Sequence, residues 1–138
     1  MRTGRSAAAW LSRVRAEKRP LYAAIVHALD AAIREGEPFV AWMRAYCEAG
    51  MAIVCDALER CPRVKLGPRP RAGMYAFFEI EGMPDSRRAC LDILAATGVG
   101  LAPGVFFGPG SERFLRACVC RAPEVLERAM DRLTPALS

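Results

Sequence analysis

The residue of this sequence best placed to do chemistry is Arg116, which lies inside the apolar run FLRACVC. Side chains of a strand alternate between two faces, so Arg116 shares one face with Phe114, Cys118 and Cys120. A guanidinium carries a rigid fork of donors that fits a carboxylate through two hydrogen bonds. Arg116 is therefore a candidate for binding a carboxylate. A surface arginine, or one that pairs with a carboxylate of the chain itself, is the alternative that its residue type favours.

A loop rich in glycine and proline precedes this strand and covers residues 103–110. Turn-forming residues set the path of such a loop. Its middle is nonetheless apolar, with two adjacent phenylalanines, Phe106 and Phe107. A solvated loop rarely needs such a pair, so we expect another part of the protein to cover it. We expect the loop to join two strands, over residues 99–101 and 113–120, that can pair in an antiparallel manner.

The other elements follow from helical spacing, caps and turn residues. A helix is expected to begin at Pro20 and end at Gly36, and the next to begin near Pro38. Further expectations are a helix end near Cys61, a loop over residues 65–73, a strand over residues 74–80, an N-cap at Asp85 or Ser86, a helix end at Gly98 and a last helix from Pro123. The order helix, helix, strand, helix, strand, strand, helix predicts a two-layer α/β sandwich. In this fold, helices cover a small mixed or antiparallel sheet.

Composition narrows the class of protein. A chain of 138 residues, 53% hydrophobic and 25% charged, is expected to form one globular domain. No apolar run approaches the roughly 20 residues that a membrane span needs, so we expect no membrane partner. The six cysteines form no C-x-x-C pair, and the single histidine has no partner at ligand spacing. We therefore expect no metal site, and interpret the cysteines as small buried residues of a protein in the reducing cytoplasm.

The net charge of +5 comes from eighteen arginines and two lysines, and much of it lies in residues 1–19. Nucleic-acid binding would require a basic face with interleaved aromatic residues, and the scattered arginines form no such stripe. We therefore expect no nucleic-acid partner. The apolar run within this basic segment is too short for a secretory signal. We interpret residues 1–19 as a disordered or irregular extension.

Several segments resemble class I/II aminotransferases, the fold-type I enzymes that use pyridoxal phosphate. The segment GVGLAPGVFFGPGSERFLRACVCRAPEVLERAMDRL is similar to the C-terminal end of that family, with its PG..FG loop, the arginine of the next strand and the closing helix. Upstream, PRAGMYAFFEIEG and DSRRACLDIL resemble a strand and a helix of the same domain. The similarity covers about residues 21–137. It implies a connecting helix over residues 20–36 and the C-terminal small domain over residues 37–138.

The resemblance also implies roles for particular residues. In the family, the arginine of the last strand binds the α-carboxylate of the amino-acid substrate, and by position this is Arg116. Arg113 is a weaker candidate because it lies where the loop meets the strand. Tyr75 and Phe107 are weak candidates for contacts at the substrate, and ordinary packing is at least as good an interpretation of both. We expect no catalytic residue and no cofactor ligand in this chain.

The family's Schiff-base lysine lies in a serine-rich segment that has no counterpart here. Both lysines, Lys18 and Lys65, occur in polar surroundings and are expected at the surface. The resemblance thus implies a C-terminal fragment that acts on amino acids and 2-oxo acids and is inactive without a pyridoxal-phosphate-binding large domain or a homo-oligomer partner. The alternative is a stand-alone, non-catalytic module that binds a partner or a small carboxylate.

Overall fold

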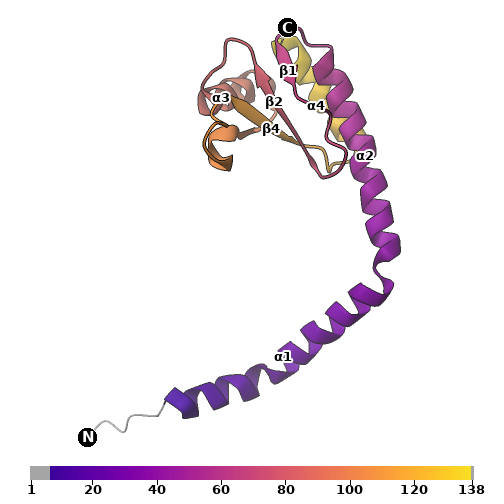
Figure 1. Ribbon diagram of the computed structural model, residues 1–138, viewed down its shortest axis with the longest axis vertical. Coiled ribbons are helices and arrows are strands. Elements are labelled where there is room, and N and C mark those ends of the chain that lie inside the picture. The colour runs from indigo at the N-terminus through magenta and orange to yellow at the C-terminus, as the bar shows by residue number, and fades with distance from the viewer. Residues whose placement is uncertain (1–6, 138) are drawn as a thin grey trace, which may run out of the picture. The chain divides into compact units, whose positions relative to one another are not determined.

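The computed structural model of the protein describes residues 7–137 (Figure 1). The chain divides into two units, one reaching to Ala41 and one from Trp42 onward, and each is described by itself. The first six residues of the expected N-terminal extension lie outside the described residues. The division into an extension, a connecting helix and a small domain stays a prediction.

Helix α1 runs from Ala7 to Glu35 and includes Pro20. The expected irregular structure up to residue 19 is therefore wrong for the described part of that segment, and so is a helix start at Pro20. Proline lacks an N–H donor and crowds the preceding turn, which is why it favours a first turn. The flanking alanine, arginine, glutamate and leucine residues have high helix propensity, and the helix continues across the proline. The predicted end at Gly36 agrees with the structure.

Helix α2 covers Glu37–Glu59, and from Trp42 onward it belongs to the larger unit. Its buried residues recur at helical spacing: Cys47, Gly50, Met51, Val54, Cys55, Ala57 and Leu58. A Cβ added to Gly50 would lie 2.1 Å from the carbonyl oxygen of Val119 and 3.0 Å from Leu126. The missing side chain thus lets α2 pack closely against the end of the sheet and against α4.

The sheet has four antiparallel strands in the order β1-β2-β4-β3. They are β1 (Val64–Leu66), β2 (Tyr75–Ile80), β3 (Ala102–Pro103) and β4 (Phe114–Cys118). The two central strands place Phe77 opposite Arg116 and Phe78 opposite Leu115. The predicted two-layer α/β sandwich is confirmed, and its sheet is antiparallel.

Two details of the sheet differ from the expectations. The loop predicted over residues 65–73 starts only after Leu66 in the structure. Val64–Leu66 instead pairs with the end of β2 and forms the edge strand β1. Three residues are too few for alternation to identify a strand from sequence. The strand expected over residues 99–101 is displaced to Ala102–Pro103. Val99 and Leu101 instead pack, partly buried, against the core.

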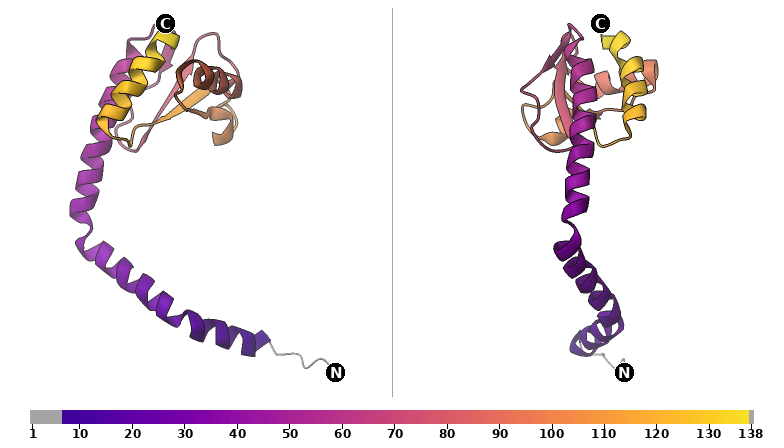
Figure 2. Two further views of the ribbon diagram at one scale, coloured as in Figure 1. Left: turned by 180° about the vertical axis from the view of Figure 1, so that it is seen from behind. Right: turned by 90° about the vertical axis from the view of Figure 1, so that its right-hand side faces the viewer.

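Helices α3 (Ser86–Thr97) and α4 (Pro123–Leu133) complete the helical layer, and α4 lies beside α2 (Figure 2). Asp85 caps α3 by accepting hydrogen bonds from the N–H groups of Arg87 and Arg88. Gly98 ends α3 in the left-handed conformation, with φ 72°, and Pro123 begins α4. These three predictions are confirmed. A short 3-10 turn, η2 (Thr134–Leu137), follows α4.

The core lies between one face of the sheet and the three helices α2, α3 and α4. The strand residues that point into it alternate along β2 and β4, as predicted: Ala76, Phe78, Ile80, Leu115 and Ala117. Leu58 of α2, Ile93 of α3 and Leu133 of α4 meet them there. The same strands therefore present their other residues on the face that the helices do not cover.

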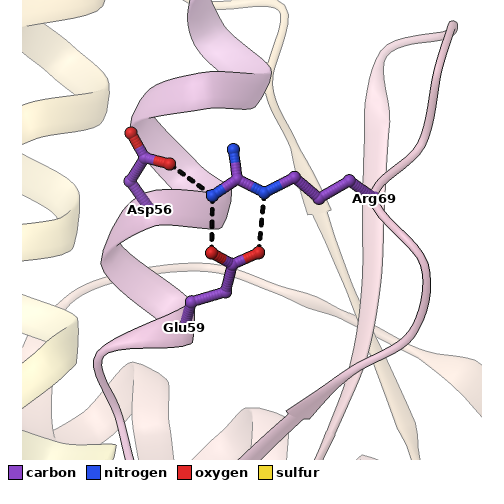
Figure 3. A network of polar contacts seen from close by, with 3 residues as sticks. All are labelled: Asp56, Glu59 and Arg69. Carbon is purple, nitrogen blue, oxygen red and sulfur yellow. Dashed lines mark hydrogen bonds and ion pairs between the residues drawn. The ribbon is translucent and has the colours of Figure 1, made fainter.

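Arg69 anchors the loop that connects β1 to β2 onto α2 (Figure 3). Its Nε donates to Glu59 at 2.6 Å, and its terminal nitrogen binds both Glu59, at 2.5 Å, and Asp56. The hydrogen bond from Arg69 holds the pKa of the Glu59 carboxyl below its usual value. Asp56 and Glu59 are three residues apart, so they share one side of the helix and can bind one guanidinium.

The six cysteines are free, and four of them are buried: Cys47, Cys55, Cys61 and Cys90. Burial raises the pKa of each of these four thiols. Cys118 is exposed and Cys120 is half-buried, so the expectation of six buried cysteines is wrong for this pair. Within residues 7–137, no helix combines the length and the apolar character that crossing a membrane requires.

Candidate functional site

Arg116 lies in the middle of β4, on the face of the sheet opposite the helices, and is half-buried. Its guanidinium carbon is 4.0 Å from the ring centre of Tyr75 and also 4.0 Å from that of Phe107. Ring contacts use the π surface of a guanidinium, whereas its N–H donors lie in its plane. The two rings therefore hold the side chain and leave donors for an oxyanion.

The sheet register and the loop before β4 bring these two rings to Arg116. Tyr75 begins β2 and pairs with Cys118, one step along the same face from Arg116. Phe107 ends a 3-10 turn, η1 (Gly104–Phe107), which returns the chain toward the open face of the sheet. A Cβ on Gly104 would lie 2.1 Å from the carbonyl oxygen of Ser111, so only glycine fits where this turn begins.

Ser86 ties the loop to the start of α3 at two points. Its hydroxyl accepts a hydrogen bond from the N–H of Val105 at 3.3 Å, and its own N–H donates to the carbonyl of Glu112 at 2.9 Å. Ser86 is buried, so these bonds are shielded from water. The loop that carries Phe107 is thereby fastened near both of its ends.

A row of aromatic rings continues from Phe107 across the open face. Phe77 makes an edge contact with Phe107, with ring centres 6.1 Å apart, and stacks on Phe114 at 5.0 Å. Phe77 is the cross-strand neighbour of Arg116. Sequence reasoning did not assign Phe77 or Phe114 to the site, although period-two alternation places both of them on the face of Arg116.

The two candidate arginines differ in their partners. Arg113 forms an ion pair with Glu79 of β2, with Nε 3.6 Å from the carboxylate oxygen. Arg116 forms no ion pair or hydrogen bond with a carboxylate of residues 7–137. The alternative in which Arg116 serves an internal ion pair therefore has no support in the described part of the chain. Arg116 is the better candidate for an external carboxylate.

The loop expected to be covered is open to solvent in the described residues. Phe106 is 64% exposed, and the guanidinium of Arg87 lies 5.3 Å from its ring centre. Val105 and Phe107 are also exposed. The expected cover is therefore not supplied by the described part of this chain.

Both lysines are exposed, Lys18 on α1 and Lys65 on β1. Lys65 is the cross-strand partner of Glu79 on the edge of the sheet. A lysine that forms a Schiff base is normally activated by removal from water or by a neighbouring cation. Neither environment fits a Schiff base with pyridoxal phosphate, and no reaction step through that cofactor follows from these residues.

Comparison with known proteins shows what this chain is similar to. No family model matches the chain. The aspartate aminotransferase of Musicola paradisiaca is 30% identical over 112 residues, which are 80% of this chain and 28% of that protein. This chain therefore spans about 28% of the length of the curated relative.

Two solved structures have the same fold in part of their chains. The aromatic aminotransferase of Pyrococcus horikoshii is 26% identical with a TM-score of 0.67, over 72% of this chain and 26% of that one. The alanine aminotransferase of Pyrococcus furiosus is 25% identical with a TM-score of 0.63, over 67% of this chain and 24% of that one. The resemblance predicted from the sequence is confirmed: the chain is similar in sequence and in fold to a portion of the aminotransferases.

Proposed function

We propose that this chain is the C-terminal, substrate-binding part of a class I/II aminotransferase, which transfers an amino group between an amino acid and a 2-oxo acid. The premise is the similarity to a portion of known aminotransferases. The observation that carries the proposal is the guanidinium of Arg116, which lies against two aromatic rings and has no internal carboxylate partner in residues 7–137.

In this proposal, Arg116 binds the α-carboxylate of the substrate. Its N–H donors form two parallel hydrogen bonds with the carboxylate, which fix the orientation of the group as well as its position. Tyr75 and Phe107 keep the guanidinium in place and lower its exposure to water, which strengthens the interaction. Arg113 neutralises Glu79, so a neighbouring negative charge opposes substrate binding less.

Pyridoxal phosphate, when bound to an aminotransferase, supplies the electron sink for amino transfer. The lysines of this chain do not suit its Schiff base, so we propose that another domain or subunit supplies the lysine and the phosphate ligands. By itself this chain is then inactive in transamination. The free cysteines support a cytoplasmic location as a part of the same proposal.

A titration with a simple 2-oxo acid tests the role of Arg116. We expect pyruvate to shift the NMR signal of the Arg116 side-chain N–H with a Kd in the millimolar range, about 1 mM, because one charge-assisted pair carries the binding. Methyl pyruvate, which lacks the carboxylate, should cause no such shift.

Two variants control this titration. Arg116→Gln should abolish the response to pyruvate, whereas Arg113→Gln should retain it with only a small loss of affinity, because Arg113 acts by neutralising Glu79. Equal binding of pyruvate by the wild type and by Arg116→Gln would contradict the proposal. A visible absorption band on adding pyridoxal phosphate, followed by borohydride trapping on Lys18 or Lys65, would contradict the proposal that another domain or subunit supplies the lysine.

A further inference from the structure

A cavity lies on the covered side of the sheet. Its volume is about 380 Å³, and it is lined by α4, the segment after α3 and the end of β4. Ala117 and Cys118 line it from the end of β4, whereas Arg116, Tyr75 and Phe107 do not line it. The cavity is therefore separate from the proposed carboxylate site.

Three arginines line this cavity: Arg121, Arg128 and Arg132. No aspartate or glutamate of residues 7–137 lines it, and these three arginines form no ion pair within that range. Other arginines of the described chain do find carboxylates: Arg34, Arg69, Arg88 and Arg113. The cavity therefore has an uncompensated positive charge.

Two of these arginines are near neighbours on one helix. Arg128 and Arg132 are four residues apart on α4, and like charges at this spacing repel each other and destabilise a helix. Glu124, Glu127 and Asp131 belong to the same helix but do not line the cavity. A bound anion would reduce this repulsion.

The rest of the lining indicates the shape of the anion. The floor is apolar, with Val54 of α2 and Leu126 and Met130 of α4. Two glycines, Gly98 and Gly100, form one side; a Cβ on Gly100 would meet nothing within 4 Å, so that side is open to solvent. A cavity of this size, apolar with a few convergent polar groups, is typical of a site for a small organic molecule.

We propose that this cavity binds a small organic molecule that carries a doubly charged oxyanion on an apolar body. The oxyanion contacts Arg121, Arg128 and Arg132 at the mouth of the cavity, because guanidinium forks match phosphate and carboxylate oxygens. The apolar body rests on the floor beside Leu126. The site does not depend on the cofactor or on the substrate arginine.

Calorimetry with three probes tests the two parts of this ligand. Phenyl phosphate carries both the dianion and the apolar body, inorganic phosphate carries the charge alone, and phenol carries the body alone. We expect phenyl phosphate to bind the wild-type chain most tightly, and its affinity to fall as sodium chloride is raised from 50 to 500 mM, values chosen to span the screening range. Binding of phenol as tight as that of phenyl phosphate would overturn the proposal.

Variants assign the binding to this cavity. Arg128→Gln and Arg132→Gln should each weaken phenyl phosphate binding about tenfold, because each removes a charge-assisted contact. Arg60→Gln removes an exposed arginine outside the cavity and should leave the affinity unchanged. Equal weakening in all three variants would mean diffuse attraction to a basic protein and would overturn the site.

Thermal unfolding compares the Tm of each protein with and without ligand, so a variant's own stability does not affect the result. Phenyl phosphate should raise the Tm of the wild type and of Arg116→Gln, but not that of the Arg128→Gln/Arg132→Gln double variant. Loss of the Tm shift in Arg116→Gln would place the anion at the open face and contradict this second site. Failure of pyruvate to bind Arg116 would leave these outcomes unaffected, so the two proposals fail separately.

Discussion

The two faces of the sheet are built from the same strands and differ in almost every physical respect. On the covered face, β2 and β4 contribute Phe78 and Leu115, which are fully buried against the helices. On the open face, the same two strands contribute Arg116, which follows Leu115, and Tyr75, which is 41% exposed. Alternation by a single residue thus separates the side chains that stabilise the fold from those that can bind a ligand.

The open face is nevertheless organised without a hydrophobic core. Its side chains are held by ring stacking between Phe77 and Phe114, by ring contacts to Arg116 and by one ion pair. Aromatic pairs contribute about 0.5–1.5 kcal/mol beyond the area that they bury. Such contacts position a guanidinium while they leave its donors accessible, which burial in the core would not.

The strongest test of the comparison replaces equivalent rings on the two faces. Phe78→Ala should lower the free energy of unfolding by about 3–5 kcal/mol, because it leaves a cavity in the core. Phe77→Ala, one residue away on the open face, should cost only about 1–2 kcal/mol for the lost ring contacts and area. Urea denaturation measures both values, and equal losses would contradict the separation of roles.

A substitution at Arg116 should change binding with little effect on stability. Arg116→Lys keeps the charge but loses the planar fork, so we expect pyruvate affinity to fall about tenfold. The free energy of unfolding should change by less than about 1 kcal/mol, because the residue lies outside the core. Paired NMR titration and urea denaturation check this result. A large loss of stability with unchanged affinity would show a structural role instead.

The close approach between α2 and the end of the sheet depends on one glycine. Gly50→Ala introduces a Cβ 2.1 Å from the carbonyl oxygen of Val119, and the helix must shift to relieve the clash. We expect a loss of about 1–3 kcal/mol, measured by urea denaturation. Gly67→Ala is the matched control, since a Cβ there meets nothing within 4 Å. Equal costs at the two glycines would mean that helix packing is looser than described.

The smallest expected effect concerns the exposed network around Arg69. The folded-state pKa of Glu59 is lowered below its ordinary value of 4.5, chiefly by the hydrogen bond from Arg69. A carboxyl group of this kind stabilises the fold above its unfolded pKa, and the contribution is lost as the pH falls through the folded pKa. Arg69→Ala should therefore lower the Tm slightly at pH 7 and by less at pH 3, since acid weakens the same interaction.

Arg71→Ala is the control for that experiment, because Arg71 is exposed in the same loop and forms no ion pair within residues 7–137. Its Tm should follow that of the wild type at both pH values. A Tm difference for Arg69→Ala that persists unchanged at pH 3 would mean that the carboxylates are not its partners. Differential scanning calorimetry measures these shifts.

Local sequence signals located most of the elements. Asp85 as an N-cap, Gly98 as a helix end and Pro123 as a helix start are features of backbone chemistry, which acts over a few residues. The same signals failed at Pro20, where propensity on both sides outweighed the cost of one proline. They also missed β1, because three residues acquire a strand conformation only by pairing with β2.

The candidate site was predicted only in outline. Period-two alternation placed Arg116 and Phe114 on one face, and the resemblance to aminotransferases singled out Arg116. Whether an arginine has an internal partner is a question of distance between strands, and residue types cannot answer it. In the structure, Arg113 forms an ion pair with Glu79, and Arg116 contacts the rings of Tyr75 and Phe107.

The sequence by itself determined how side chains alternate along β2 and β4, where α3 begins and ends and where α4 begins, and which family the chain resembles. These depend on the period of side chains along a backbone and on short-range capping. Only the tertiary structure decided that Tyr75 and Phe107 meet at Arg116, and that three arginines surround one cavity. Such groups come together from distant positions because strand register and packing, which involve the whole domain, set the distances between them.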